Sequence, residues 1–511
     1  MIDTNALRQK ILDMAIRGKL VPQNPNDEPA SVLLERIRAE KQQLIKEGKI
    51  KKDKNDSVIF KGDDNRYYEK VGSEVKDITD ELPFEIPDNW VWIRLGYIVD
   101  FSQSDTVAAS QINPSSWVLD LEDIEKDSGK LLQRKTFGET QSKSDKHCFF
   151  KGNVLYSKLR PYLNKVIVAD ADGYCTTEIL AFNFGQHIAA QYAKTFFMSP
   201  YFVDYAMDGA YGVKMPRIGS HRGNSALMPV PPYTEQIHLV NRIDELFEQI
   251  DIIEQNQTDI DTLYDEFRKR TLTLAIQGKL VPQNPNDEPA SVLLERIRAE
   301  KKAKLGKKYV DSYIYKSDDN CYYEHIAGRA QDELVEVPFD IPYGWSWCRL
   351  AIFAQVLGGK RIPAGRQLTN ENTGHYYIKV SDMKENTVCL DKLQFVPTDI
   401  YPTISRYIIN KEDVYITVAG TIGRVGTIPN ELDGANLTEN ADRIVIDEID
   451  QHWLVKCLLS DVIQEQIKEA TTKVGQPKLA IARIEKFLIP LPPLAEQKRI
   501  VAKINEIFAM L

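Results

Sequence analysis

Basic side chains that could neutralise phosphate are concentrated in a few stretches that contain no acidic residue. Residues 151–165 and 209–225 form two such stretches, and residues 357–369 form a third. Tyr156 and Tyr162 are interleaved with the basic residues of the first stretch. Lysine and arginine bind phosphate oxygens, and arginine, glutamine, serine and threonine also read base edges in the major groove. The pattern therefore predicts local DNA-binding loops.

The predicted DNA contacts fall into two groups, one in each half of the chain. The first group comprises Lys151, Ser157, Lys158, Arg160, Tyr162, Lys165, Lys214, Arg217, His221 and Arg222. The second group comprises Lys360, Arg361, Arg366, Thr421, Arg424, Lys473, Gln476 and Lys478. The whole chain of 511 residues carries a net charge of −9, which repels phosphate. DNA contact must therefore come from these local surfaces, and for any single residue the alternative role is to keep the chain soluble.

The sequence lacks the motifs that catalysis on DNA would need. Adenine methylation requires an Asn/Asp-Pro-Pro-Phe/Tyr segment to hold a flipped base, and residues 113–117 and 231–233 do not match it. There is no GxxxxGK[ST] phosphate loop, and the histidines and cysteines lack metal-binding spacing. The glycine-rich run at 420–426 predicts a turn rather than a dinucleotide site. We expect no intrinsic enzyme activity, no metal and no cofactor.

An internal repeat must position these loops. Residues 18–41 and 278–301 both read GKLVPQNPNDEPASVLLERIRAEK. Three weaker pairs follow in the same order: DDNRYYEK at 63 and DDNCYYEH at 318, LPFEIPDNWVWIRLG at 82 and VPFDIPYGWSWCRLA at 337, and MPVPPYTEQIHLVNRIDELF at 228 and IPLPPLAEQKRIVAKINEIF at 489. The chain is therefore two copies of one unit. Because the helical parts agree while the globular parts diverge, we expect one shared partner and two different targets.

A heptad pattern predicts one long central helix. Its seam comprises Leu239, Ile243, Leu246, Ile250, Ile253, Gln257, Ile260, Tyr264 and Phe267. The repeat is out of phase with the chain ends, so the termini should supply two halves of a second, antiparallel helix. The seam residues of those halves are Ile500, Ile504, Ile507, Leu7, Ile11 and Met14. We expect the termini to lie close together; the alternative is that the central helix packs only on its own domain.

Three duplicated segments resemble those of the specificity subunits of Type I restriction–modification systems. They are a leading motif P-F-[ED]-I-P-x-x-W-x-W-x-R-L at 83–95 and 338–350, a trailing motif P-x-P-P-x-x-E-Q at 229–236 and 490–497, and the repeated segment at 18–41 and 278–301. The resemblance covers nearly the whole chain and implies that each globular domain reads one half of an asymmetric, bipartite DNA site. It also implies that the helices set the spacing and dock the partners.

The partners that this resemblance implies are double-stranded DNA, two modification subunits and two restriction subunits. The modification subunits would bind S-adenosylmethionine and methylate adenine, and the restriction subunits would use ATP and Mg²⁺. The competing interpretation is a scaffold whose two domains bind proteins rather than DNA, which would suit the acidic composition.

The expected fold class is α+β, with two mixed α/β target-recognition domains joined by two long antiparallel helices in a pseudo-two-fold, circularly arranged repeat. The expected segments are an N-terminal helical region at 1–50, a linker at 51–81, a first recognition domain at 82–234, the central helix and repeated segment at 235–301, a linker at 302–336, a second recognition domain at 337–495 and a C-terminal half-helix at 496–511. No apolar stretch is long enough for a membrane span or a signal peptide, so we expect a cytoplasmic protein.

Overall fold

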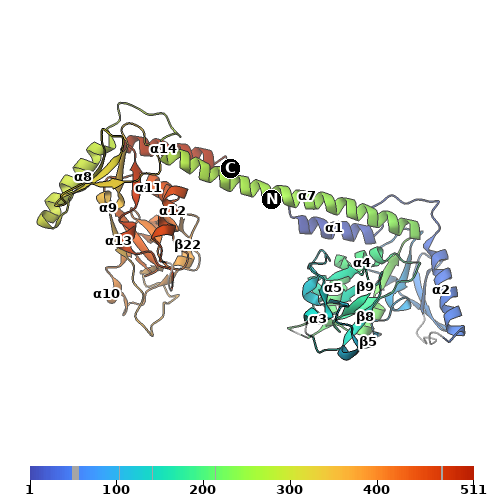
Figure 1. The fold of residues 1–511 in the computed structure, drawn as a ribbon. Coiled ribbons are helices and arrows are strands. Elements are labelled where there is room, and N and C mark those ends of the chain that lie inside the picture. Colours follow the sequence, from blue (N-terminus) through green and yellow to red (C-terminus); the bar gives the residue numbers. More distant parts are fainter. Residues whose placement is uncertain (49–56, 103, 141, 213, 473–475, 511) are drawn as a thin grey trace. The chain divides into compact units, whose positions relative to one another are not determined.

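The computed structural model describes residues 1–48, 57–102, 104–140, 142–212, 214–472 and 476–510 (Figure 1). The chain divides into two compact units, residues 1–258 and 259–511. No helix in the described part of the chain is long and apolar enough to cross a membrane.

The first unit begins with helices and ends in the long helix α7, which continues into the second unit. Its helices are α1 (Thr4–Ile16), α2 (Ala30–Lys46), α3 (Phe137–Thr140), α4 (Ala190–Met198), α5 (Pro200–Asp208), α6 (Ser220–Ser225) and α7 (Tyr233–Ile276). Its strands are β1 (Ser57–Lys61), β2 (Tyr67–Val71), β3 (Glu74–Asp77), β4 (Val91–Arg94), β5 (Thr106–Val107), β6 (Trp117–Leu119), β7 (Lys135–Thr136), β8 (Lys146–Phe149), β9 (Val154–Ser157), β10 (Val166–Val168), β11 (Gly173–Cys175), β12 (Ile179–Phe182), β13 (Ala210–Tyr211), β14 (Arg217–Ile218) and β15 (Leu227–Val230).

The second unit follows the same general plan, with a helix and a small three-stranded sheet before a mixed α/β domain and a final helix. Its helices are α8 (Ala290–Leu305), α9 (Leu350–Phe353), α10 (Tyr401–Ile404), α11 (Gln451–Leu458), α12 (Asp461–Ala470), α13 (Ile481–Ile484) and α14 (Leu494–Phe508). Its strands are β16 (Ser312–Lys316), β17 (Tyr322–Ile326), β18 (Glu333–Val335), β19 (Ser346–Arg349), β20 (Ala354–Gly358), β21 (Tyr376–Ile378), β22 (Met383–Lys384), β23 (Thr387–Val388), β24 (Gln394–Phe395), β25 (Ile408–Ile409), β26 (Val414–Thr417), β27 (Val425–Thr427), β28 (Ala435–Leu437), β29 (Ala441–Ile446) and β30 (Leu488–Leu491).

Both recognition domains are mixed α/β structures, but their sheets differ. The first domain has sheets of order β10-β9-β12 and β5-β8-β11-β6-β7, and the second has β20-β29-β26-β27 and β24-β21-β28-β25. The core of the first domain contains a large aromatic cluster, in which Tyr156, Phe197 and Phe202 are fully buried or nearly so. The core of the second is mainly aliphatic around Trp453. The divergence seen in the sequence therefore extends to topology and packing.

The leading and trailing motifs close each domain in the same way. Strand β4 pairs antiparallel with β15, and β19 pairs antiparallel with β30. Just after β15, the buried carboxylate of Glu235 accepts hydrogen bonds from Trp90 Nε1 at 2.9 Å and from Gln23 Nε2 at 2.6 Å. This carboxylate thus joins the repeated segment, the leading motif and the trailing motif in one contact, because each motif supplies one partner.

The helix pairing is partly as predicted and partly different. In unit 1, α1 packs along α7, where Leu239, Ile243 and Ile250 are buried and Arg8 forms an ion pair with Asp251 at 2.5 Å. In unit 2, Ile500 and Ile504 of α14 share a core with the end of α7. Each half-helix predicted at a terminus therefore packs against α7 within its own unit.

The seam predicted on α1 is displaced by one residue. Leu7 is exposed and Ile11 and Met14 are only half-buried, whereas Arg8, Leu12 and Ala15 are buried. The reason is that α1 also packs on α4 and α5 of its own domain, which turns its apolar face away from a pure two-helix seam. Helix α1 therefore packs on its own domain as well as on α7.

The seam predicted along α7 also ends early, since Ile260, Tyr264 and Phe267 are exposed. Near this end of the seam, Gln257 Oε1 accepts a hydrogen bond at 2.6 Å from the backbone N–H of Ile2, which precedes α1. Leu246, Ile253 and Ile507 are half-buried.

The segments expected to be linkers fold into small sheets. Strands β1-β2-β3 form one antiparallel meander, and strands β16-β17-β18 form a second. Ile59 and Val335 face inward, and the inner faces pack on Trp92 and Trp347 of the leading motifs. The linker prediction was wrong because polar turn residues and charges obscured an alternation of inward and outward side chains.

Candidate nucleic-acid interface

In the first recognition domain, two of the predicted basic stretches meet at one surface. The loop after β9 contacts the segment before β14: Arg160 N–H donates to Pro216 O at 2.7 Å, and Ile218 N–H donates to Lys158 O at 3.2 Å. Leu159 and Arg217 form an isolated β-bridge. Residues far apart in sequence are therefore held together by backbone hydrogen bonds.

The shape of the first loop is fixed by two residues in the left-handed conformation. Arg160 has φ 51° and Asn164 has φ 50°, a region that costs a non-glycine residue roughly 1 kcal/mol or more. Buried Asn164 donates from Nδ2 to Met198 O at 3.0 Å. Ser157, predicted to contact DNA, is buried and donates from Oγ to Leu159 O at 2.8 Å. We therefore assign Ser157 a structural role in shaping the loop.

Several of the predicted cations are already bound to groups of their own domain. Arg217 forms an ion pair with Glu178, with a closest N–O distance of 3.0 Å. Arg222 forms an ion pair with Asp208 at 3.0 Å. Lys165 donates from Nζ to the carbonyl oxygen of a residue near the end of β6, Leu121, at 2.6 Å. Tyr162 and Lys214 are exposed, Lys158 is half-buried, and exposed His221 lies instead beside Arg94 and Glu69, near the first small sheet.

Lys151 does not belong to this surface. It lies before β9, whereas the loop of the candidate interface begins after that strand, and its backbone N–H donates to Asp172 Oδ1 at 2.8 Å. Lys151 was included in the predicted group because it is close in sequence to Lys158 and Arg160. Strand β9 separates it from them in the structure.

The second domain holds the equivalent junction. Ala419 and Lys478 form an isolated β-bridge, and Leu479 N–H donates to Val418 O at 3.0 Å. Thr421, Arg424, Gln476 and Lys478 are exposed. Lys473 lies outside the described residues. The pairing of Lys478 with Ala419 matches that of Arg217 with Leu159, so the alignment of these two cations in the sequence agrees with the structure.

A third loop joins the junction of the second domain. In the sheet, Gly358 at the end of β20 pairs with Asp442, and Thr417 at the end of β26 pairs with Ala441, so the loops after β20 and β26 leave the same edge. That edge therefore carries the exposed cations from 360–366 together with those from 421–424 and 476–478.

Both arginines of the third loop already have acidic partners. Arg361 pairs with Glu439 and Arg366 pairs with Asp399. Burial would raise the pKa of Glu439, but hydrogen bonding to Arg361 and to the backbone holds it below its ordinary value. Glu439 therefore stays ionised beside the candidate surface.

The sequence-based prediction did not include the acidic residues of this surface, because it considered only stretches that contain no acidic residue. Glu178 immediately precedes β12 and Glu439 shortly precedes β29, and each binds an arginine of the predicted group. The Thr-Glu dipeptide that both domains share, at 177–178 and 438–439, is the feature of the sequence that could have indicated these two glutamates. A third acid, buried Asp442, has its pKa raised by burial to about 6, with Lys478 opposing the shift.

The described part of the chain contains no group of three or more histidine, cysteine, aspartate or glutamate side chains arranged to hold a metal. The arrangement at each junction offers cations, hydroxyls and an amide. These groups can bind phosphate and base edges.

Comparisons with known proteins agree with this geometry. The family model of the Type I restriction modification DNA specificity domain matches residues 342–510. The EcoAI specificity subunit of Escherichia coli is 29% identical, over 98% of this chain and 88% of the relative. The EcoEI specificity subunit of the same species is 27% identical over the same shares.

Among solved structures, one from work titled "Structural basis underlying complex assembly and conformational transition of the type I R-M system" has a TM-score of 0.57. It is 18% identical and covers 84% of this chain and 92% of that chain. This likeness confirms the predicted α+β fold class. The chain thus has two matched units with unlike domains, and nearly its whole length is similar to specificity subunits of Type I restriction–modification systems.

Proposed function

We propose that this chain is the non-catalytic DNA-reading subunit of its complex, and that each recognition domain reads one half of an asymmetric, bipartite site. One observation carries the proposal. The same backbone junction, Leu159 with Arg217 and Ala419 with Lys478, is surrounded by different side chains in the two domains. An equivalent framework with different contact groups is what two readers of different sequences require.

The contacts fall into two chemical classes. The exposed lysines, Lys214 and Lys478, suit phosphate, which positions a protein on DNA without reading sequence. Arg217, held by Glu178, and Gln476 offer planar donor groups that suit base edges. These groups lie on loops and short strands, so we infer that loops do the reading.

The long helices would set the half-site spacing and dock the modification subunits. Helix α7 has 44 residues, which at ~1.5 Å per residue gives a rod of roughly 66 Å. Its exposed apolar residues Ile260, Leu263, Tyr264 and Phe267 recur at helical spacing on one face. An apolar face of this kind suits a partner helix.

The remaining components follow from the role in the complex. We infer two modification subunits and two restriction subunits, and S-adenosylmethionine, ATP and Mg²⁺ would be bound by those subunits. The complex would act in the cytoplasm.

The proposal is tested by selection from a randomised duplex library with this chain and its modification subunit co-expressed, at two salt concentrations. We expect enrichment of one split, asymmetric motif and weaker binding at the higher salt, because phosphate contacts release counterions. Assembly without sequence enrichment would instead favour the scaffold interpretation.

A further inference from the structure

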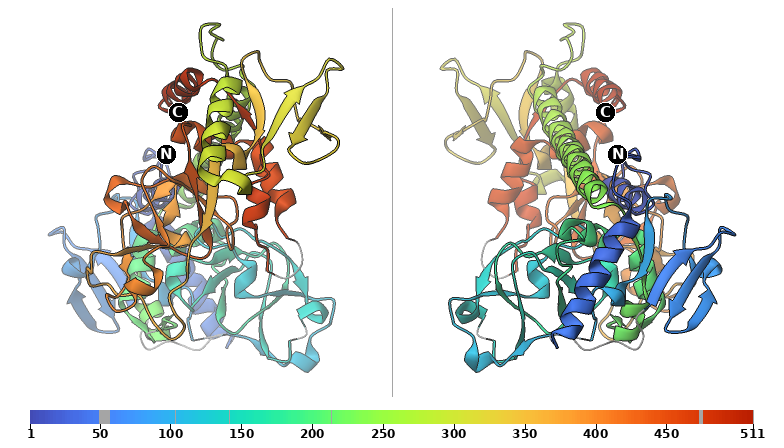
Figure 2. Two further views of the ribbon diagram at one scale, coloured as in Figure 1. Left: turned by 90° about the vertical axis from the view of Figure 1, so that its left-hand side faces the viewer. Right: turned by 90° about the vertical axis from the view of Figure 1, so that its right-hand side faces the viewer.

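The two meanders form a second pair of matched exposed surfaces, in addition to the identical segments at 18–41 and 278–301. Figure 2 shows each projecting from its unit, β1-β2-β3 in blue and β16-β17-β18 in yellow. Recognition of DNA by the loop junctions does not use them. Their preservation while the recognition domains diverged therefore calls for a separate role.

The match extends to individual side chains. Phe60 lies opposite Tyr68 with ring centroids 5.9 Å apart, and Tyr315 lies opposite Tyr323 at 6.2 Å. In each pair, the tyrosine on the second strand donates its hydroxyl to an aspartate in the turn. Tyr68 donates to Asp64 at 2.7 Å, and Tyr323 donates to Asp319 at 2.8 Å. Both units thus present a pair of neighbouring aromatic rings beside a carboxylate.

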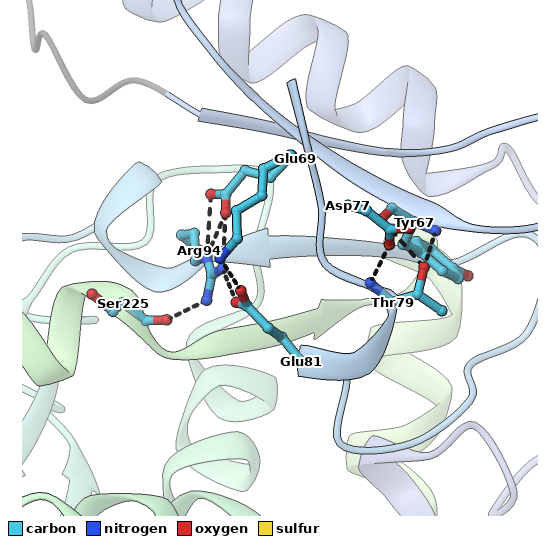
Figure 3. Close-up of polar contacts among 8 residues, drawn as sticks. Tyr67, Glu69, Asp77, Thr79, Glu81, Arg94 and Ser225 are labelled. Atoms are coloured by element: carbon cyan, nitrogen blue, oxygen red, sulfur yellow. Dashed lines mark hydrogen bonds and ion pairs between the residues drawn. The ribbon is translucent and has the colours of Figure 1, made fainter. Parts of the chain in front are cut away.

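The first meander is fastened so that one face stays outside. Arg94, on β4, pairs with Glu69 at 2.8 Å and Glu81 at 2.7 Å and donates to Ser225 O at 3.0 Å (Figure 3). Thr79 further ties the end of the sheet by accepting a hydrogen bond from the backbone N–H of Tyr67 at 2.9 Å. The sheet is therefore fixed relative to the strand that opens the first recognition domain.

The second meander is fastened in the same way. Arg349, on β19, pairs with Glu324 at 2.8 Å and donates to Lys486 O at 3.0 Å. In both units the inner face covers a leading-motif tryptophan, Trp92 or Trp347. Only the outer face is left for a partner.

The meander segments combine exposed aromatic side chains with a net negative charge. Phe60 is 42% exposed, Tyr313 40% and Tyr315 38%. Acidic residues outnumber basic ones within 57–81 and again within 311–336. Negative charge repels phosphate, which argues against DNA as the ligand. Exposed aromatic side chains are typical of protein interfaces, where an arginine or lysine of the partner can lie against the rings.

We propose that the outer faces of the two meanders are matched docking surfaces for the modification subunit, one copy on each unit. The contact chemistry is a basic side chain of that subunit against the aromatic pair and its aspartate. The inference rests on the proposed function, because that function supplies a subunit present in two copies. A subunit that methylates a base within a half-site must also contact the unit that reads that half, and each meander is fastened to the first strand of its recognition domain.

The test counts modification subunits bound to the full chain by native mass spectrometry during a titration. One variant carries Phe60→Ser with Tyr68→Ser, and a second carries Tyr315→Ser with Tyr323→Ser. We expect each to keep one subunit with unchanged affinity and to bind the other at least tenfold more weakly, and the combined variant to lose both. Circular dichroism melting checks the fold, and Leu132→Ser with Leu390→Ser, which alters exposed apolar residues outside the meanders, is the control.

A second pair keeps the test decisive if the serine variants unfold. Phe60→Lys and Tyr315→Lys place a positive charge on each exposed face and should weaken the same two binding events. Two subunits bound with wild-type affinity by these variants would overturn the inference. If those variants also select the same split DNA motif, the proposed function stands without the meander contact. If the wild-type chain neither binds the modification subunit nor selects a motif, the proposed function itself fails.

Discussion

The scaffolds of the two units agree contact by contact, whereas their recognition loops agree only in backbone framework. Glu496 accepts a hydrogen bond from Trp345 Nε1 at 3.0 Å and from Gln283 Nε2 at 2.8 Å, repeating the contacts of Glu235 in the first unit. At the loop junctions, by contrast, unit 1 has two left-handed residues where unit 2 has a glycine-rich turn. The comparison indicates that one shared frame holds two different sets of loops, as the proposed reading of two different half-sites requires.

The largest effect should come from breaking the shared frame. Trp90→Ala and Trp345→Ala each remove a large buried side chain and leave a buried carboxylate without its indole donor, so each should destabilise its unit by about 3–5 kcal/mol. Thermal unfolding followed by circular dichroism measures this. Equal losses in both units are expected. Tolerance of the change in one unit would show that the two frames are not energetically equivalent.

The loops should behave in the opposite way, each variant affecting one half-site. Arg217→Ala should weaken binding at the half-site of the first domain, and Lys478→Ala at that of the second, each roughly tenfold. Fluorescence anisotropy with duplexes in which one half is scrambled measures each half separately. Lys151→Ala is the matched control and should change little, because Lys151 lies at the other end of β9. Equal loss at both halves from one variant would contradict separate readers.

A smaller difference should appear as a function of pH. Asp442, with a pKa of about 6, lies opposite Ile416 in the register of β29 and β26. The corresponding position in unit 1 is Leu180, which lies opposite Tyr156 in the register of β12 and β9. Because its folded-state pKa exceeds the ordinary value of 3.8, the stability contributed by Asp442 is present at low pH and lost as pH rises to about 6.

Asp442→Asn should therefore flatten the pH dependence of unfolding for unit 2 and stabilise it at pH 7 by about 1–2 kcal/mol, allowing for solvent screening. Leu180→Asn in unit 1 is the control, since it introduces an amide without removing a titrating group. An unchanged pH profile for Asp442→Asn would exclude this carboxylate as the cause.

The repeat was visible in the sequence because identical letters specify identical contacts. The GKLVPQNPNDEPASVLLERIRAEK segments, the paired tryptophans and the Glu-Gln pair predicted the two-unit architecture, and the comparisons confirm the α+β class. The loop junctions were predictable only in part. The alignment of Arg217 with Lys478, which lie the same distance before the trailing motif, agrees with their two matching β-bridges, and their contact with DNA stays a prediction.

Other features depend on contacts between segments far apart in sequence. Ser157 looked like a DNA contact until its hydroxyl was seen bound to Leu159 O. Glu178 and Glu439 were overlooked because ion pairing across the domain cannot be read from local composition. The seam on α1 was displaced because a helix that packs on two neighbours does not present a single heptad stripe. The meanders were missed because their strands are short and highly charged.

The most direct test replaces the second recognition domain with a second copy of the first, joined at the shared leading and trailing motifs, and repeats the library selection. If each domain reads its own half-site, the duplicated chain, checked for folding and for binding of the modification subunit, should select a symmetric site. That site would contain the first half twice, in opposite orientations. Selection of the original asymmetric motif, or of no motif by a folded and assembled chain, would contradict the account.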